Sequence, residues 1–297
     1  MLPPDADADA VDPRIVRPPT FGRVPRAASM PWRLTLEPAA SGIAADQAQL
    51  GDLDVRAASI VGPGHRCEDP AVARQDSYRL GRDKAGRYLI VAVADGMSDS
   101  RRSDLGAMVA SRCAVDTVRG AINHGIPPDE NMLHNAFRRS AAAMVTAARN
   151  SELTTNDVRC ALIVAIVPAF PESRFGNRAA WFASLADVSA WVHAGTSWAQ
   201  VAGDRKTDDM DRNLVRHFLP HQPDAVSICR QMLPADATIT VVTDGVGDAF
   251  TDVAGADAWF ADRWRAPVPL ESFLLDVGYH ASGQLDDRTA VTVWCRS

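Results

Sequence analysis

The sequence predicts an α+β fold in which blocks of strands are separated by helical sections. Apolar runs of strand character stand before and after a pair of helical stripes, and a second helical section precedes the last strand. Strands and helices therefore do not alternate regularly, as they would in a βαβ protein. The 297 residues are 46% hydrophobic and 23% charged, which is typical of a soluble globular protein with a sizeable core.

The first 50 residues differ in composition from the rest of the chain. They are rich in Pro, Ala and Asp and show no sustained periodicity. We therefore predict that residues 1–50 form a mostly disordered leader and that residues 51–297 form the folded domain. One stretch of the leader, PWRLTLEP at 31–38, has the composition of a short docked strand.

Strands followed by two helices are predicted in the first half of the domain. VRAASIVG at 55–62 is typical of a strand, and residues 76–96 of two strands joined by a polar turn. Ser103 can cap the helix that follows, and a second helix begins after Pro127-Pro128. The apolar stripe of the first helix contains Leu105, Met108, Val115, Val118 and Ile122. The stripe of the second contains Leu133, Ala136, Phe137, Met144 and Ala148.

The second half of the domain returns to strands and then to helices. Three apolar runs at 159–168, 179–187 and 188–195 are short and rich in β-branched or aromatic residues, which favours strands. A polar loop over 203–213 follows them. The remaining predicted elements are a helix near 224–233, a strand at 237–245, helical material from about 247 to 280, and a last strand from 289.

Charge and cysteine content argue against several classes of protein. The net charge of −6 gives no electrostatic reason to expect nucleic acid as a partner. The five cysteines are scattered and never spaced as C-x-x-C, so they indicate reduced cytosolic thiols, with neither a disulfide framework nor a zinc site. No run approaches eighteen apolar residues and no signal peptide is evident, so we expect a cytoplasmic protein without a membrane span.

Two copies of one pattern, VAVADGM at 91–97 and TVVTDGV at 240–246, indicate chemistry at strand ends. In each copy an apolar run ends in Asp-Gly, a pair that is also typical of hairpin turns. A hairpin needs a second strand directly after the turn, and neither copy is followed by one. Asp95 and Asp244 are therefore better explained as functional carboxylates, although turn or helix-cap roles stay open.

Two further aspartates have similar settings. Asp76 begins a predicted strand and Asp286 lies just before the last one, although either could belong to a solvated turn. Carboxylates gathered at one sheet edge raise each other's pKa unless a cation compensates them. Because Mg²⁺ and Mn²⁺ favour oxygen ligands, the four aspartates predict a divalent metal centre. Gly96 would leave its backbone carbonyl accessible to such an ion.

Six motifs in order resemble the metal-dependent protein serine/threonine phosphatases, or type 2C (PPM) family, particularly its bacterial and actinobacterial branch. The resemblance covers about residues 54–297. Its motifs are GPGH…RQDS, VAVADGMSD…SDLGAMVAS, CALIVAIV, SLADVSAWVH, TVVTDGVGDAF and DDRTAVTV. Each motif alone is weak, but their shared order is specific. The resemblance implies a four-layer α-β-β-α sandwich with two central antiparallel sheets and two metal ions at one end.

The resemblance also implies a role for each aspartate. Asp95 would bridge two Mn²⁺ or Mg²⁺ ions, with the Gly96 carbonyl on one of them. Asp244 and Asp286 would bind at the other site, and Asp76 would bind directly or through a water. Asp187 and Asp248 would frame a third, weaker site; each is as readily explained as an ordinary structural aspartate.

The implied activity is hydrolysis of phosphoserine and phosphothreonine by a hydroxide that bridges the two ions. The in-line reaction would form no phosphoenzyme. The implied partner is a phosphorylated protein, in opposition to a serine/threonine kinase, and the chain is expected to be a monomer. Two alternatives stay open: a pseudophosphatase that serves as a binding or regulatory module, and a hydrolase of a small phosphorylated metabolite.

Several positions depart from the family pattern. Ala71 replaces an arginine that grips substrate phosphate in many relatives, so His65, Arg66 or Arg74 would have to substitute for it. A histidine in such a stretch is more often an ordinary surface-loop residue than an acid catalyst or a phosphate ligand. Ser98-Asp99 replaces two glycines next to the site, Cys160-Ala161 replaces two threonines, and Ala186 replaces a glycine before Asp187.

Overall fold

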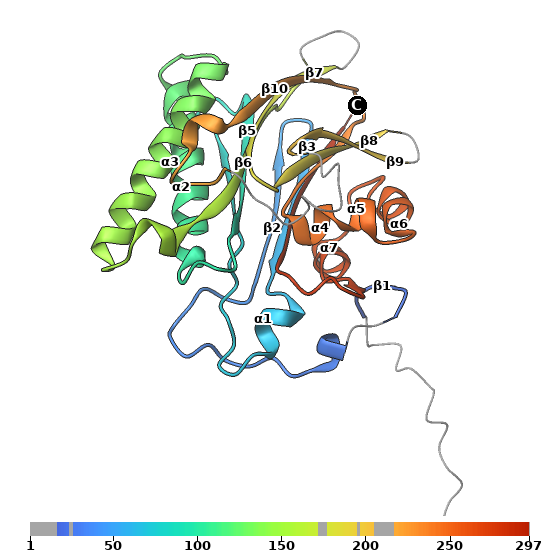
Figure 1. Cartoon of the computed structure of the whole chain (residues 1–297). Coiled ribbons are helices and arrows are strands. Elements are labelled where there is room, and N and C mark those ends of the chain that lie inside the picture. The colour runs from blue at the N-terminus through green and yellow to red at the C-terminus, as the bar shows by residue number, and fades with distance from the viewer. Residues whose placement is uncertain (1–16, 24–25, 172–176, 195–196, 205–216, 297) are drawn as a thin grey trace, which may run out of the picture.

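The computed structural model describes residues 17–23, 26–171, 177–194, 197–204 and 217–296. Two sheets lie face to face at its centre, and helices cover the outer face of each (Figure 1). This α-β-β-α arrangement confirms both the α+β class and the four layers implied by the resemblance. Among the described residues, no helix is long and apolar enough to cross a bilayer.

The first sheet has five antiparallel strands in the order β10-β7-β6-β5-β4. Its central strands, β5 and β6, are almost wholly buried, because one face packs on helices and the other on the second sheet. The edge strand β4 pairs with β5 alone. The bounds are β4 Ser77–Arg82, β5 Tyr88–Gly96, β6 Cys160–Pro168, β7 Arg178–Leu185 and β10 Ser227–Leu233.

The second sheet has six antiparallel strands in the order β2-β3-β13-β11-β8-β9. Alternate side chains of the two sheets interdigitate to form the central core, as in other sheet-on-sheet packings. The bounds are β2 Ile43–Leu50, β3 Leu53–Ile60, β8 Ser189–Ala194, β9 Ser197–Ala202, β11 Thr238–Val242 and β13 Arg288–Cys295. A separate two-residue parallel pair joins β1 (Thr20–Phe21) to β12 (His280–Ala281).

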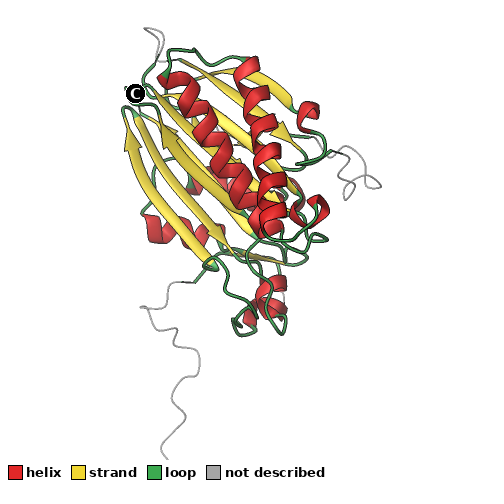
Figure 2. Cartoon of the chain, turned by 90° about the vertical axis from the view of Figure 1, so that its left-hand side faces the viewer, coloured by secondary structure: helices red, strands yellow, loops and turns green. Residues whose placement is uncertain are grey.

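Two long helices, α2 (Ser103–Asn123) and α3 (Glu130–Asn150), lie side by side over the first sheet (Figure 2). The predicted stripe of α3 is buried throughout. The stripe of α2 is buried only in its second half, because Met108 is 41% exposed. Ser103 was also wrongly expected to cap α2: Arg102 holds that position and no side chain caps the helix. In α3, the Asp129 carboxylate accepts a hydrogen bond from the Met132 N–H.

Shorter helices cover the second sheet and confirm the helical section predicted between 247 and 280. They bury an aromatic cluster that includes Phe260, Trp264, Phe273 and Trp294. Their bounds are α4 Asp244–Gly247, α5 Ala249–Asp252, α6 Ala256–Arg263 and α7 Leu270–Val277. The short helix α1 (Pro63–Cys67) follows β3 in the sequence and begins one of the loops at the site. Three short 3₁₀ turns, η1 Arg26–Ser29, η2 Thr155–Val158 and η3 Pro223–Ala225, complete the elements.

Two sequence predictions about edge strands are wrong. The predicted leader, residues 1–50, contains β2, which pairs with β3 over eight positions and makes residues 43–50 part of the domain. The helix predicted near 224–233 is the strand β10, which pairs with β7 along its whole length. Pairing with a neighbouring strand outweighs the weak local preference of both segments. Residues 1–16 and most of the predicted 203–213 loop lie outside the described residues, and the stretch 31–38 contributes only the bridge Thr35–Ala71.

Candidate functional site

Four of the predicted aspartates lie at one end of the sandwich because of the register of its strands. Asp76 precedes β4, whose first residue pairs with Ala94, so Asp76 is beside the end of β5, where Asp95 lies. Asp286 precedes β13, whose start pairs with the end of β11, and Asp244 follows β11 as the first residue of α4. Antiparallel pairing therefore brings each strand start to its neighbour's end. Neither Asp-Gly pair forms a hairpin, as the sequence indicated.

Asp95 is the electrostatic centre of this group. Burial raises its pKa well above the ordinary range, and the negative charges of Asp76, Asp244, Asp187 and Asp286 raise it further. The charges of all four therefore act on Asp95. The sequence indicated that Asp76, Asp244 and Asp286 could gather near Asp95, and that they hold metal ions stays a prediction. A buried cluster of this kind holds several negative charges only with a compensating cation.

Asp76 is fully buried and oriented by two threonines. Its Oδ2 accepts hydrogen bonds from the hydroxyls of Thr243 and Thr289, each at 2.8 Å. Burial and the charge of Asp287 raise the pKa of Asp76 to about 8, although the two hydroxyls act in the opposite direction. The two threonines come from β13 and the end of β11, so they tie Asp76 to the opposite sheet.

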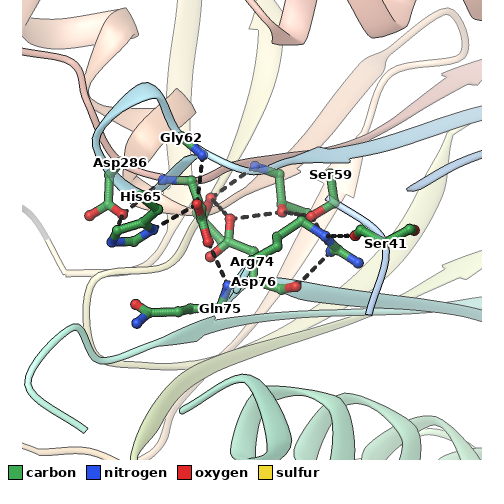
Figure 3. Close-up of polar contacts among 11 residues, drawn as sticks. Ser41, Ser59, Gly62, His65, Arg74, Gln75, Asp76 and Asp286 are labelled. Carbon is green, nitrogen blue, oxygen red and sulfur yellow. Dashed lines mark hydrogen bonds and ion pairs between the residues drawn. The ribbon is translucent and has the colours of Figure 1, made fainter. Parts of the chain in front are cut away.

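Asp287 organises the loops around the site, and the sequence analysis did not single it out. Its Oδ1 accepts from the Gly62 N–H at 2.6 Å, and its Oδ2 accepts from the Gln75 N–H at 2.5 Å (Figure 3). The same Oδ1 lies 2.9 Å from Nδ1 of His65. The signal for Asp287 in the sequence is its place next to Asp286. The sequence predicts only Asp286 as a ligand and allows the pair to be a solvated turn.

His65 is held between Asp287 and Asp286. Burial opposes its charged form, but the hydrogen bond to Asp287 and the charges of Asp287, Asp286 and Asp76 outweigh burial and raise the pKa of His65 to about 9. Nε2 lies 3.9 Å from Oδ1 of Asp286, on the side away from Asp287. The imidazole is therefore charged at neutral pH and donates from both nitrogens.

A cavity of about 370 Å³ opens at this end of the sandwich. His65, Asp244, Asp248 and Asp286 line it, so it brings predicted metal and phosphate ligands to one solvent-accessible space. Asp187 acts on Asp95, whereas Asp248 lies beside Asp244 at the cavity. Donor atoms of His65, Asp286 and Asp287 also lie within 4.8 Å of one another.

Residues 62–271 match the family profile of protein phosphatase 2C. This chain belongs to the protein phosphatase 2C family. The family consists of divalent-metal-dependent serine/threonine protein phosphatases, and the match includes the loops of His65, Asp76, Asp95 and Asp244. It stops before Asp286 and Asp287, which belong to the site by their geometry.

Solved structures with this fold are distant in sequence. A bacterial serine phosphatase has a TM-score of 0.56 at 12% identity, over 82% of this chain and 98% of its own. A serine/threonine phosphatase of S. agalactiae has a TM-score of 0.54 at 14% identity, over 82% and 100%. PppA of Pseudomonas aeruginosa, a regulatory component of the T6SS, has a TM-score of 0.52 at 15% identity, over 82% and 98%. No curated protein matches the chain.

The donor set of this phosphatase 2C domain fits divalent metal ions. The charged groups that act on Asp95 are carboxylates, the hard oxygen donors that Mg²⁺ and Mn²⁺ prefer, and the nitrogen donor of His65 lies beside Asp286 and Asp287. The raised pKa values of Asp76 and Asp95 show that burial and mutual repulsion disfavour their charged forms. A dication among them would reverse this preference.

Of the three substitutes considered for the phosphate-binding arginine, only His65 reaches the cavity. Arg66, which the sequence offered as a phosphate ligand, does not line the cavity. Its guanidinium donates to the Met30 carbonyl at 2.7 Å and lies over the Trp32 ring. Arg74 donates to the Ser59 hydroxyl, to the Asp76 carbonyl and to the Ser41 carbonyl, so it clamps the two sheets together (Figure 3).

Two of the other departures from the phosphatase 2C pattern, Asp99 and Ala186, have local structural explanations. Asp99 forms an ion pair with Arg159 at 2.8 Å, so the charge added in place of a glycine is neutralised on the surface. Arg159 also lies over the Phe218 ring and donates to the Ser100 hydroxyl, which fixes the loop between β5 and α2. Ala186 adopts the left-handed conformation with φ of 72°, which explains why the family favours glycine there.

Proposed function

We propose that this phosphatase 2C domain hydrolyses phosphoserine and phosphothreonine in a protein, with two Mn²⁺ or Mg²⁺ ions at the aspartate cluster. The observation that carries the proposal is the action of four other carboxylates on the buried Asp95. Asp95 would contact both ions and the Gly96 carbonyl one of them, with Asp76 on the same side. Asp244 and Asp286 would hold the other ion, and Asp187 and Asp248 would frame a third, weaker site.

The chain's own residues orient the substrate and the ligands. When bound, the ions supply an activated water and neutralise charge on the phosphoryl oxygens. Thr243 and Thr289 fix the direction in which Asp76 presents its second oxygen. His65 keeps a proton on Nδ1 toward Asp287 and offers the N–H at Nε2 to a phosphoryl oxygen in the cavity. The reaction is an in-line displacement of the serine or threonine alkoxide without a phosphoenzyme.

Replacing Asp244 with Asn tests this function. We expect hydrolysis of a phosphopeptide and of an aryl phosphate to fall by more than the ~10–100-fold that loss of outer-shell partners costs a metal enzyme. Activity of the unaltered protein should require Mn²⁺ or Mg²⁺ and disappear with a chelator. Asp257→Asn, in the first turn of α6 and away from the cavity, is the matched control and should retain activity. Full activity of Asp244→Asn would refute the mechanism.

A second candidate function is a pseudophosphatase that binds partners without turnover. It is favoured by Ala71 and by the commitment of Arg66 and Arg74 to other contacts. Calorimetry with Mn²⁺ separates the two: tight binding without hydrolysis of any phosphate ester favours the pseudophosphatase. Including sugar and nucleotide phosphates among the substrates tests the remaining alternative, a hydrolase of a small phosphorylated metabolite.

The proposal also covers the protein partner, the oligomeric state and the cellular location of this phosphatase. The substrate is a protein phosphorylated by a serine/threonine kinase, and the phosphatase acts as a monomer in the cytoplasm. Size-exclusion chromatography with light scattering tests the oligomeric state, a search for phosphoproteins that accumulate when the gene is deleted tests the substrate, and cell fractionation tests the location.

A further inference from the structure

A second hollow, the α2 groove, runs along α2 on the flank of the first sheet. We define it by Arg74, Arg79, Arg102, Met108, Arg112 and Arg139, which line two cavities of about 320 and 410 Å³ together with four aspartates, Asp46, Asp76, Asp104 and Asp116. The two cavities share Arg79 and Met108 and therefore adjoin. Asp76 lines one end, so the groove begins at the aspartate cluster and extends to α3.

Two arginines in the α2 groove pair with no residue that the structure describes. Arg102 pairs with Asp104 and Arg112 with Asp116, while Arg74 is buried in its clamp. The side chains of Arg79 and Arg139, both exposed, make no hydrogen bond or ion pair with any described residue. Asp104 and Asp116 offset Arg102 and Arg112, Asp76 lies by Arg74, and Asp46 accepts a hydrogen bond from the Tyr78 hydroxyl. Five arginines against four aspartates leave the groove with a net charge of +1 in a chain of −6, and Arg79 and Arg139 carry the positive charge that is available to an anion.

The groove also offers apolar surface and a strand edge. Met108, expected in the core, is 41% exposed here, and Val109 and Ala143 lie beside it. Ser77, Tyr78 and Arg79 all line the cavity although consecutive strand residues point to opposite faces, so the groove follows the edge of β4. An edge strand can pair with an extended peptide through backbone hydrogen bonds.

We propose that the α2 groove docks an extended acidic segment of a protein partner, with an apolar side chain on Met108 and carboxylates or phosphates on Arg79 and Arg139. Because the cavity at the aspartate cluster is not lined by an arginine among the described residues, this groove would supply the positive charge for recognising a substrate. The statement that this partner is the substrate rests on the proposed function. The statement that the groove docks an acidic segment does not rest on it.

The test uses a fluorescein-labelled peptide of Asp and Glu around one Leu, and a matched peptide of Asn and Gln. Fluorescence anisotropy should show binding of the acidic peptide alone, weakening between about 0.1 and 1 M salt as screening increases. The variant Arg79→Ser/Arg139→Ser should bind about tenfold more weakly, which corresponds to about 1.4 kcal/mol. Arg82→Ser/Arg149→Ser, with exposed arginines from the same strand and helix, should bind as the unaltered protein does.

Three results would overturn the proposal. They are an unchanged peptide affinity in Arg79→Ser/Arg139→Ser, the same loss of affinity in both double variants, or binding of the neutral peptide as tight as that of the acidic one. Arg79→Lys/Arg139→Lys keeps the charge and should retain most of the affinity, which separates charge from misfolding. Aryl phosphate hydrolysis should be unchanged in Arg79→Ser/Arg139→Ser, because neither arginine lines the cavity at the aspartate cluster. Peptide binding without any turnover would leave the docking site intact and refute only the proposed function.

Discussion

At the residue scale, the site depends on carboxylates with different tasks. Asp244 lines the cavity and its charge acts on Asp95, whereas Asp287 uses both oxygens on the Gly62 and Gln75 N–H groups and on His65. Asp286 and Asp287 are adjacent in the sequence, and only the structure shows which one faces the cavity. Strand-end position was enough to place Asp76, Asp95, Asp244 and Asp286 at one end of the sandwich, because antiparallel register makes strand ends meet; that they hold ions stays a prediction. The roles of Asp287 and Arg66 depend on loop geometry that no local pattern encodes.

Ala186 provides a test of backbone strain beside Asp187. An alanine at φ of 72° costs roughly 1–2 kcal/mol relative to the right-handed region, and glycine does not incur that cost. We expect Ala186→Gly to raise the free energy of unfolding by about 0.5–1 kcal/mol after the entropy of glycine is included. Urea denaturation measures it. Ala142→Gly, on the exposed face of α3, is the control and should lower stability by up to ~1 kcal/mol. An unchanged or lower midpoint for Ala186→Gly would show that the site carries no strain.

At the element scale, interior elements were predictable and two edge strands were not. Buried strands such as β6 and β11 are continuous apolar runs, and α3 has a clear helical stripe. The edge strands β2 and β10 are only half-buried and rich in Ala or in polar residues, so their sequences lack a strong period. Their structure comes from hydrogen bonding to β3 and β7, which is a non-local effect.

The packing of α2 against η2 gives a prediction for two glycines of one helix. A Cβ on Gly106 would lie within 2.0 Å of the Val158 carbonyl oxygen, whereas a Cβ on Gly120 would meet nothing within 4 Å. We therefore expect Gly106→Ala to destabilise the protein by about 1–3 kcal/mol or more, because backbone must shift. Gly120→Ala should stabilise it by up to ~1 kcal/mol through helix propensity. Chemical denaturation distinguishes them, and similar effects of the two substitutions would refute the close contact of α2 with η2.

At the scale of the whole molecule, the sandwich concentrates negative charge at one end, and this gives a pH dependence. The folded-state pKa of Asp76 is raised to about 8, so the metal-free native state binds a proton that the unfolded state releases near pH 4. The contribution of Asp76 to stability is therefore fully present below about pH 4 and is lost as the pH rises toward 8. His65, with a pKa raised to about 9, acts in the same direction at higher pH.

Thermal unfolding of metal-free protein between about pH 5 and pH 8 measures this effect. We expect the melting temperature to fall with increasing pH, and Mn²⁺ to raise it most at pH 8, where the carboxylates are charged. Asp76→Asn removes one titrating group and should flatten the metal-free profile. A melting temperature that rises over this range without metal would contradict the raised pKa values.

The central claim is that Asp76, Asp95, Asp244 and Asp286 together hold divalent ions. A crystal structure of the protein soaked in Mn²⁺, with anomalous scattering measured at the manganese edge, tests it most directly. We predict two anomalous peaks among these four carboxylates, with Asp95 contacting both. The absence of a peak at Asp95, or a single ion bound by His65, Asp286 and Asp287 instead, would contradict it.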